Sequence, residues 1–167
     1  MQNDVVSYFL DLVVIDSESK KERAIADKLK KDLEELGAIV EEDDCGLKFG
    51  GNAGNLYAYF PGVINKKPIL LCAHCDTVVP GKGIKPTIEN GRIFTDGTTV
   101  LGGDDKSGIA EILMAIKQIK DKGIAHPPIE VLITVSEEIG LLGAKNFDIS
   151  KLQAAFGYAL DTHQVGE

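Results

Sequence analysis

Three short apolar runs constrain the fold of this chain more than any other feature of its sequence. They occupy residues 69–73, 129–135 and 156–160 and hold the aliphatic and aromatic side chains that are typical of buried strands. Between the first two runs lies a segment, about 104–122, whose apolar residues recur at helical spacing and which ends at Gly123. Strands that alternate with a helix in this way predict an α/β sandwich with a mostly parallel central sheet.

The other periodic segments predict further elements around this sheet. Residues 3–16 and 19–36 have the pattern of helices. In the second of these, Ser19 and Glu22 have the spacing of a capping box, and Gly37 is the expected end of the helix. Short β-prone segments bounded by turn residues predict strands at 38–42 and 55–60 and a hairpin over 84–95 that turns at Asn90-Gly91.

Length and composition exclude several classes of protein. The 167 residues suit one domain with a sizeable core, and a net charge of −8 argues against a nucleic-acid-binding surface. We find no apolar run long enough to span a membrane and no secretory signal at the N-terminus. The three cysteines, Cys45, Cys72 and Cys75, do not form a disulfide framework, so we expect reduced thiols in a cytoplasmic protein.

Residues able to bind a metal ion follow each of the three apolar runs. Ligands of open α/β sheets bind beyond the carboxyl ends of the strands, where such residues would meet. A single acid at a strand end is more often an ordinary turn or capping residue. Several carboxylates brought together without a cation would repel one another, so the set favours a metal site, with two ions. The residues are His74 and Asp76 after the first run, Glu137 and Glu138 after the second, Asp161 after the third, and Asp104 at the start of the intervening helix.

The spacing within this set suggests separate tasks. His74 and Asp76 are two residues apart, so on an extended chain they share a face, and Asp76 can hold one ring nitrogen while the other binds metal. The helix macrodipole at Asp104 favours the ionised carboxylate that a metal needs. Glu137 and Glu138 are adjacent and point to different sides, so one can bind metal while the other stays free as a base.

The pair Cys72-Ala73-His74-Cys75 admits two other interpretations, a zinc thiolate site or a redox centre. The sequence has no second cysteine pair to complete a four-thiolate site, and the motif does not open a helix as a thioredoxin-like pair would. Alternation along a strand also directs Cys72 and Cys75 to opposite faces. We therefore expect both cysteines to be buried structural residues.

At this point four segments resemble a known family. They are Ala73-His74-Cys75-Asp76-Thr77-Val78, the stretch 95–110 with Asp-Gly-Thr-Thr and Gly-Gly-Asp-Asp-Lys-Ser-Gly, Ser136-Glu137-Glu138-Ile139-Gly140, and Ala159-Leu160-Asp161. In this order they are similar to the cocatalytic zinc metallopeptidases of peptidase T, the glutamate carboxypeptidases and the aminoacylases. The resemblance is strongest to peptidase T, an aminotripeptidase. It implies a zinc-exopeptidase-like three-layer α/β sandwich and a short peptide as substrate.

The resemblance also implies a role for each site residue. His74 and Asp161 would bind one zinc, Asp104 would bridge both zincs, and Glu138 would bind the second. Asp76 would orient His74, and Glu137 would be the general base that takes a proton from the attacking water and passes it to the leaving amine. In the family the peptide after the bridging aspartate is cis, so the resemblance implies a cis bond between Asp104 and Asp105.

The family pattern extends beyond what this sequence holds. In the family the second zinc takes a histidine from far downstream, after a lid and dimerisation domain, so we expect residues 1–167 to be the N-terminal portion of a catalytic domain with one complete zinc site. His163 is the only histidine after Asp161, and it would crowd Asp161, the ligand of the other zinc.

Three hypotheses about function follow: a peptidase T-like aminopeptidase, a catalytically impaired remnant that binds metal or a partner, or an aminoacylase or glutamate carboxypeptidase-like amidohydrolase. Cobalt or manganese could replace zinc, and a homo-oligomer is possible.

Overall fold

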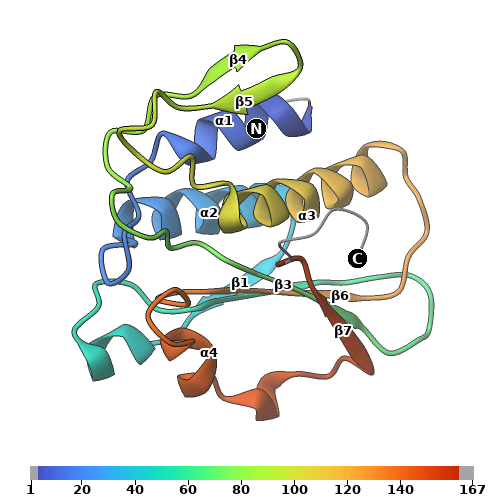
Figure 1. Ribbon diagram of the computed structural model, residues 1–167. Helices are drawn as coiled ribbons and strands as arrows, with labels where there is room; N and C mark the ends of the chain where they lie inside the picture. Colours follow the sequence, from blue (N-terminus) through green and yellow to red (C-terminus); the bar gives the residue numbers. More distant parts are fainter. Residues whose placement is uncertain (1–3, 162–167) are drawn as a thin grey trace.

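The computed structural model describes residues 4–161 as a layered α/β fold (Figure 1). A five-stranded sheet in the order β1-β2-β6-β3-β7 forms the middle layer, and a separate two-stranded hairpin, β4 and β5, stands apart from it. The strands are β1 (Ile39–Glu42), β2 (Leu56–Phe60), β3 (Ile69–His74), β4 (Thr87–Glu89), β5 (Arg92–Phe94), β6 (Ile129–Thr134) and β7 (Phe156–Ala159). The helices are α1 (Val5–Val13), α2 (Arg23–Leu36), α3 (Gly103–Asp121) and α4 (Leu142–Asn146), with short 3₁₀ turns η1 (Cys45–Phe49) and η2 (Ile149–Lys151).

The sheet is mixed, whereas the sequence predicted a mostly parallel one. Strands β3, β6 and β7 run parallel to one another, whereas β2 is antiparallel to both of its neighbours, β1 and β6. The α/β class is as expected, and β3 and β6 are joined through α3 as a parallel crossover requires. The connections on either side of β2, residues 43–55 and 61–68, contain no long helix, so the chain reverses direction at each of them.

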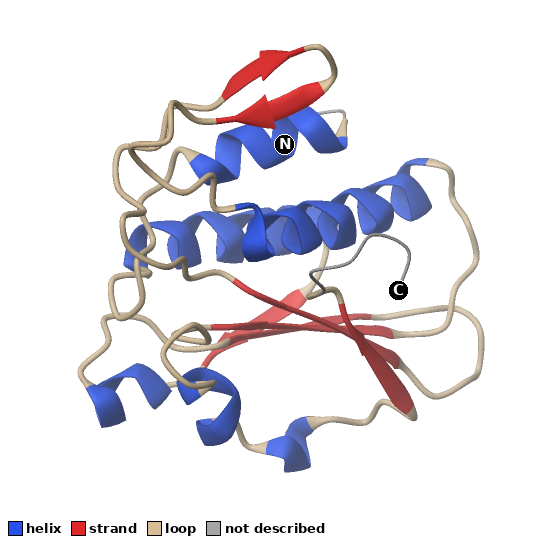
Figure 2. Cartoon of the chain, viewed as in Figure 1, coloured by secondary structure: helices blue, strands red, loops and turns tan. Residues whose placement is uncertain are grey.

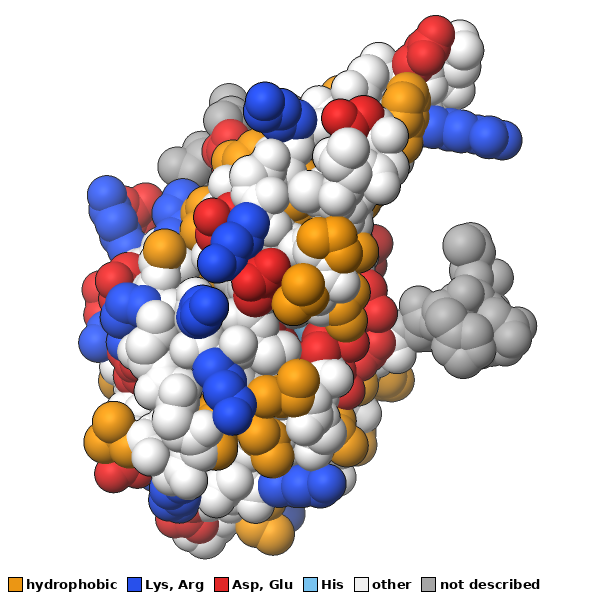
Figure 3. All heavy atoms as spheres, turned by 60° about the vertical axis from the view of Figure 1, so that its left-hand side comes forward, with side chains coloured by type: hydrophobic (Ala, Val, Ile, Leu, Met, Phe, Trp, Pro, Cys, Tyr) orange, Lys and Arg blue, Asp and Glu red, His pale blue; other side chains and the backbone are white. Residues whose placement is uncertain are grey.

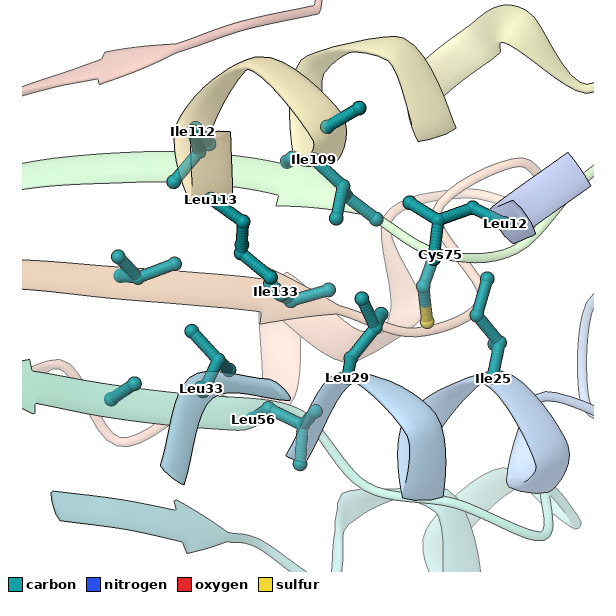
Figure 4. Packing of buried hydrophobic residues seen from close by; sticks show 14 of the residues in the cluster. Leu12, Ile25, Leu29, Leu33, Leu56, Cys75, Ile109, Ile112, Leu113 and Ile133 are labelled. Carbon is teal, nitrogen blue, oxygen red and sulfur yellow. The ribbon is translucent and has the colours of Figure 1, made fainter. Parts of the chain in front are cut away.

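Helices cover both faces of the sheet (Figure 2). α2 and α3 lie on one face, α1 packs against α3, and α4 lies with the 3₁₀ turns on the other face. The main core fills the space between the sheet and the long helices, where Leu29, Leu113 and Ile133 are buried together (Figure 4). A smaller cluster around Tyr57, Leu132 and Phe147 lies on the opposite face. The apolar stripes predicted for the two long helices are thus confirmed as core positions.

The two cysteines of the Cys-x-x-Cys pair lie on different faces of the sheet, as expected. Cys75 is buried in the main core, and its side chain lies among Leu12, Ile25 and Leu29 (Figure 4). Cys72 packs against the smaller cluster on the other face and is only partly buried, whereas it was expected to be buried. Both are free thiols, as is Cys45. This arrangement agrees with a structural role for both residues.

The start of α2 differs from the prediction. The helix begins at Arg23, and the expected capping box does not form, because the side chain of neither Ser19 nor Glu22 bonds to the helix end. Both side chains are directed to segments far along the chain, where they find hydrogen-bond partners in Asp76 and Ser136. The end of the helix is as predicted, since Gly37 adopts the left-handed conformation with φ of 101°. Tertiary contacts therefore override the local capping signal.

Two further expectations concern the hairpin and the membrane. The hairpin forms with Asn90 and Gly91 at its turn, both at positive φ as a tight two-residue turn requires. Among residues 4–161, we find no helix whose length and hydropathy would let it cross a membrane.

Candidate metal centre

The site forms where the carboxyl ends of two neighbouring parallel strands meet the start of α3. His74 is the last residue of β3, and Glu138 follows β6 by four residues. Asp104 lies in the first turn of α3, with backbone angles of φ −82° and ψ 110° that hold it outside the regular helix. One potential ligand atom from each of these three residues lies within 4.8 Å of the others. The fold thus brings together three of the four predicted metal ligands.

His74 is buried and contacts carboxylates on both sides of its ring. Its Nε2 lies 2.9 Å from Oδ1 of Asp104, and its Nδ1 lies 3.0 Å from the backbone oxygen and 3.4 Å from Oδ1 of Asp76. Burial lowers the pKa of His74, but the hydrogen bond and charge of Asp76 and the bond to Asp104 outweigh it and raise the pKa to about 10. The pocket around this ring therefore favours a positive charge at Nε2, which a proton or a metal cation can supply.

Asp76 is fully buried and holds three separate segments together. Its Oδ2 accepts hydrogen bonds from the Ser19 hydroxyl at 2.7 Å and from the Glu138 amide at 3.2 Å, and its Oδ1 accepts one from the Glu137 amide at 2.8 Å. Burial raises the pKa of Asp76, but these bonds and His74 outweigh it and lower the pKa below its ordinary value. Asp76 is therefore an ionised buried carboxylate that fixes the strand-end turn next to His74.

Glu137 and Glu138 were expected to point to different sides, but the carboxylates of both lie near the ring of His74. Oε2 of Glu137 lies 3.9 Å from Nε2 of His74, and the Glu138 carboxylate belongs to the group around Asp104. Burial raises the pKa of both glutamates, and the charge of Asp104 adds to the rise in each. The site thus holds carboxylates that repel one another in the absence of a cation.

The residue after Asp104, Asp105, links the start of α3 to the end of β3. The Asp104–Asp105 peptide is cis, as the resemblance implied. Asp105 is buried, and its carboxylate accepts hydrogen bonds from the His74 amide at 3.3 Å and the Gly108 amide at 3.1 Å. Burial raises its pKa to about 7. The sequence alone predicted no role for this side chain, although its place inside the Asp-Asp-Lys motif was a signal that it belongs to the site.

Asp161 lies just beyond β7 and is exposed. It does not join the group of close ligand atoms formed by His74, Asp104 and Glu138. Its charge nevertheless raises the pKa of Glu137 and of Asp105, so it acts on the same site. The other downstream residue considered from sequence, His163, lies outside the described residues.

The described donor set suits zinc. Zinc takes imidazole nitrogen and carboxylate oxygen ligands, and the cluster offers Nε2 of His74 with oxygens of Asp104 and Glu138. The side chain of Asp104 is 69% exposed and that of His74 only 2%, so the centre opens to solvent on one side. Acidic side chains gather on the face of the molecule drawn in Figure 3, with apolar side chains beside them.

Comparison with known proteins decides the family. A model of peptidase family M20/M25/M40 matches residues 70–166, which carry every one of the site residues above. The chain belongs to this family. Solved structures of relatives resemble the chain in fold as well as in sequence. Two of the solved structures that it matches, the aminopeptidase PepT from Bacillus cereus and a tripeptidase from Staphylococcus aureus, both superpose with a TM-score of 0.93.

The M20/M25/M40 relatives also set the extent of the match. Sequence identity is 46% to the Bacillus cereus aminopeptidase and 41% to the Staphylococcus aureus tripeptidase, over 96% of this chain and 43% of each relative. The uncharacterized protein YqjE of Bacillus subtilis is 50% identical over 154 residues, which make up 92% of this chain and 42% of YqjE. The chain therefore spans less than half the length of these relatives.

Three supporting residues of this M20/M25/M40 site were missed from sequence alone. They are Ser19, Glu22 and Ser136. Their side chains do not bond to the clustered candidate ligands, yet they surround the turn that carries Glu137 and Glu138. Ser136 is the one with a sequence signal, since it opens the Ser-Glu-Glu-Ile-Gly segment. Ser19 and Glu22 gave a signal for a helix cap, which concealed their contacts with distant segments.

Proposed function

We propose that this chain provides the metal centre of a peptidase T-like aminopeptidase, which removes the N-terminal residue of short peptides such as tripeptides. The observation that carries the proposal is the cluster of His74, Asp104 and Glu138 within 4.8 Å, with Glu137 beside it. In support, the chain is similar to an aminopeptidase and a tripeptidase over nearly its whole length.

In this proposal each side chain has one task. His74 and Asp161 would hold one zinc, Glu138 would hold a second, and Asp104 would be a ligand of both. Asp76 keeps His74 oriented through the contacts at Nδ1, which leaves Nε2 free for the metal. Bound zinc would polarise the scissile carbonyl and lower the pKa of a water molecule.

Glu137 acts as the general base in this scheme. It is not one of the three clustered ligands, and its carboxylate lies 3.9 Å from His74 Nε2, within reach of a molecule bound at the centre. Burial raises the pKa of Glu137 toward neutral pH. This direction suits a group that accepts a proton and then donates it to the leaving amine.

We further propose that residues 1–167 correspond to the N-terminal portion of the catalytic domain of these relatives. In support, the chain covers 42% to 43% of the length of its relatives.

The three free cysteines support a cytoplasmic location for the protein.

The test combines metal binding with turnover. The purified chain is titrated with zinc and then incubated with trialanine, with Glu137→Gln as the variant and Glu111→Gln, an exposed glutamate on α3, as the matched control. We expect zinc binding in all three proteins and loss of about 10²- to 10⁴-fold in hydrolysis only in Glu137→Gln. Hydrolysis that survives Glu137→Gln unchanged would exclude Glu137 as the base.

A second candidate function has one observation in its favour. The candidate is a protein that binds metal or a partner without catalysis, and it is favoured by Asp161, which is exposed and does not join the cluster of His74, Asp104 and Glu138. Zinc binding by the 167-residue chain with no turnover of trialanine would favour this alternative over the aminopeptidase. Absence of zinc binding would exclude the metal centre itself.

A further inference from the structure

The segment between α1 and α2 lies against all three turns that carry the candidate site. Lys106, two residues after Asp104, donates its Nζ to the backbone oxygen of Ile15 at 2.8 Å. The amide of Thr77, next to Asp76, donates to the backbone oxygen of Ser17 at 3.0 Å. Further along the segment, the amide of Lys20 approaches the strand-end turn that precedes the two glutamates. A single stretch of about eight residues thus braces loops from distant parts of the chain.

Glu22, at the end of this segment, makes the most concentrated set of contacts. Its side chain is fully buried, and Oε1 accepts three hydrogen bonds: from the Ser136 hydroxyl at 2.7 Å, the Lys20 amide at 2.8 Å and the Ser136 amide at 3.0 Å. The Ser136 hydroxyl in turn accepts the Lys20 amide at 3.1 Å. A buried carboxylate directed at one serine, 114 residues away, is unusual unless it fixes that residue.

Ser136 needs such a restraint because of its backbone. It has a positive φ of 52°, a backbone conformation that residues other than glycine rarely adopt. Residues in sparsely populated conformations persist where the surroundings hold them, and they concentrate at functional sites. The next two residues are Glu137 and Glu138, and both of their amides bond to Asp76. The turn is therefore held on one side by Glu22 and on the other by Asp76.

We propose that Glu22 is a positioning residue for the metal centre: by holding Ser136 in its left-handed conformation, it directs the carboxylates of Glu137 and Glu138 toward His74. The effect on metal binding rests on the proposed function, whereas the effect on the turn does not. The helix gives no competing explanation for Glu22, since this side chain makes no capping bond to α2.

The test compares two substitutions of Glu22 with a matched control in α2, the helix that follows it. Glu22→Gln keeps an acceptor oxygen of the same shape, and Glu22→Met removes all three hydrogen bonds while filling a similar volume. The control is Asp32→Asn, which alters a buried acid of α2 that accepts hydrogen bonds from Tyr8 and Lys28 and from none of the site turns. Two quantities are measured in the full chain: residue-specific amide hydrogen exchange by NMR, and zinc affinity by titration.

For Glu22→Met we expect amide exchange at Ser136, Glu137 and Glu138 to rise about tenfold or more above any global change, and zinc affinity to fall about 10- to 100-fold. Glu22→Gln should retain most of both properties, and Asp32→Asn should change neither selectively. If Glu22→Met does not fold, Ser136→Ala, which removes only the hydroxyl, should produce the same local changes at smaller size.

Other outcomes overturn the proposal. Unchanged local exchange in Glu22→Met, or in Ser136→Ala where that variant is used, shows that the turn does not depend on Glu22. Faster exchange with unchanged zinc affinity shows that the restraint does not serve the metal centre. A wild-type chain that binds no zinc refutes the proposed metal centre, and the exchange comparison then still decides whether Glu22 holds the turn.

Discussion

At the scale of single residues, Asp76 has the most contacts at the site and no contact with solvent. It accepts three hydrogen bonds from the Ser19 hydroxyl and the amides of Glu137 and Glu138, and it also touches the His74 ring. A buried carboxylate that is satisfied in this way stabilises the fold only while all of its partners are present. The residue that orients the histidine is thus also a structural centre.

The first prediction concerns Asp76→Ala. The change leaves three donors without their acceptor, so we expect the free energy of unfolding, measured in urea, to fall by about 3 kcal/mol. Zinc affinity should fall by about 10- to 100-fold. The control is Asp148→Ala, an exposed carboxylate that bonds only to Ser150 and should cost about 1 kcal/mol or less. Equal losses in the two variants would contradict the central place of Asp76.

The second prediction concerns the thiols. Burial raises the pKa of Cys72 to about 11 and that of Cys45 to about 12, from an ordinary value of 9.0, and it raises that of Cys75 further. At pH 8 the thiolate fraction of folded Cys72 should be roughly a hundredfold below that of the unfolded chain, so Ellman's reagent should react correspondingly slowly. The unfolded protein in guanidinium is the control.

The same shift has a consequence for stability. Because the folded pKa of Cys72 lies above the unfolded one, the protonated thiol supports the folded state below about pH 9, and this contribution is lost as the pH rises from about 9 to 11. Rapid reaction of one thiol equivalent in the folded chain at pH 8 would show that burial does not protect Cys72.

At the scale of elements, Asn55 joins three of them through one side chain. Its amide nitrogen donates to Asp43 at 2.7 Å and to the Gly143 carbonyl at 3.0 Å, and its oxygen accepts the Val135 amide at 3.2 Å. These partners lie before β2, at the start of α4 and just after β6. The side chain packs closely here, because a Cβ at Gly143 would lie only 2.4 Å from the Asn55 oxygen.

The third prediction follows from these contacts. Asn55→Ala leaves the buried amide of Val135 and carbonyl of Gly143 unpaired, so we expect the free energy of unfolding to fall by about 2–4 kcal/mol. Asn146→Ala is the matched control, since that amide bonds only to the carbonyl of Leu142 four residues earlier. Its loss should be about 1 kcal/mol or less. Thermal or urea unfolding measures both, and similar losses would refute the linking role of Asn55.

At the scale of the whole molecule, the sheet is covered unevenly. β7 is an edge strand that pairs with β3, and its register places Phe156 beside Ile69 and Tyr158 beside Leu71. The β3 side chains pack against the core beneath the long helices, whereas Phe156 is 55% and Tyr158 59% exposed. Two neighbouring aromatic rings on an edge strand form a surface that favours association.

The fourth prediction is that a second copy of the 167-residue chain covers this surface. We expect the mean mass from light scattering to rise with protein concentration, and Tyr158→Lys to shift the rise to higher concentration, because a charge on an edge strand opposes pairing. Ile149→Lys, which alters an isolated exposed apolar residue, should leave association unchanged. A wild-type chain that stays monomeric at all concentrations would rule out this interface.

The sequence by itself determined the two long helices and the buried strands of the sheet, although it predicted neither α4 nor the 3₁₀ turns. Helix and strand periodicity identifies which side chains are buried, so the stripe of α3 and the runs of β3, β6 and β7 could be predicted from local pattern. The rule that ligands meet at the carboxyl ends of strands brought His74 and Glu138 to one end of the sheet, beside Asp104 at the start of α3. The same rule placed Asp161 there, and Asp161 does not join their cluster.

Only the tertiary structure decided the directions of the outer strands and the hydrogen-bond partners of buried polar groups. Ser19 and Glu22 have the spacing of a capping box, yet they bond to residues 57 and 114 positions away. A local pattern records propensity, whereas the partner of a buried carboxylate depends on which distant amides packing brings within about 3 Å. The contacts that hold Glu137 and Glu138 in place are of this second kind.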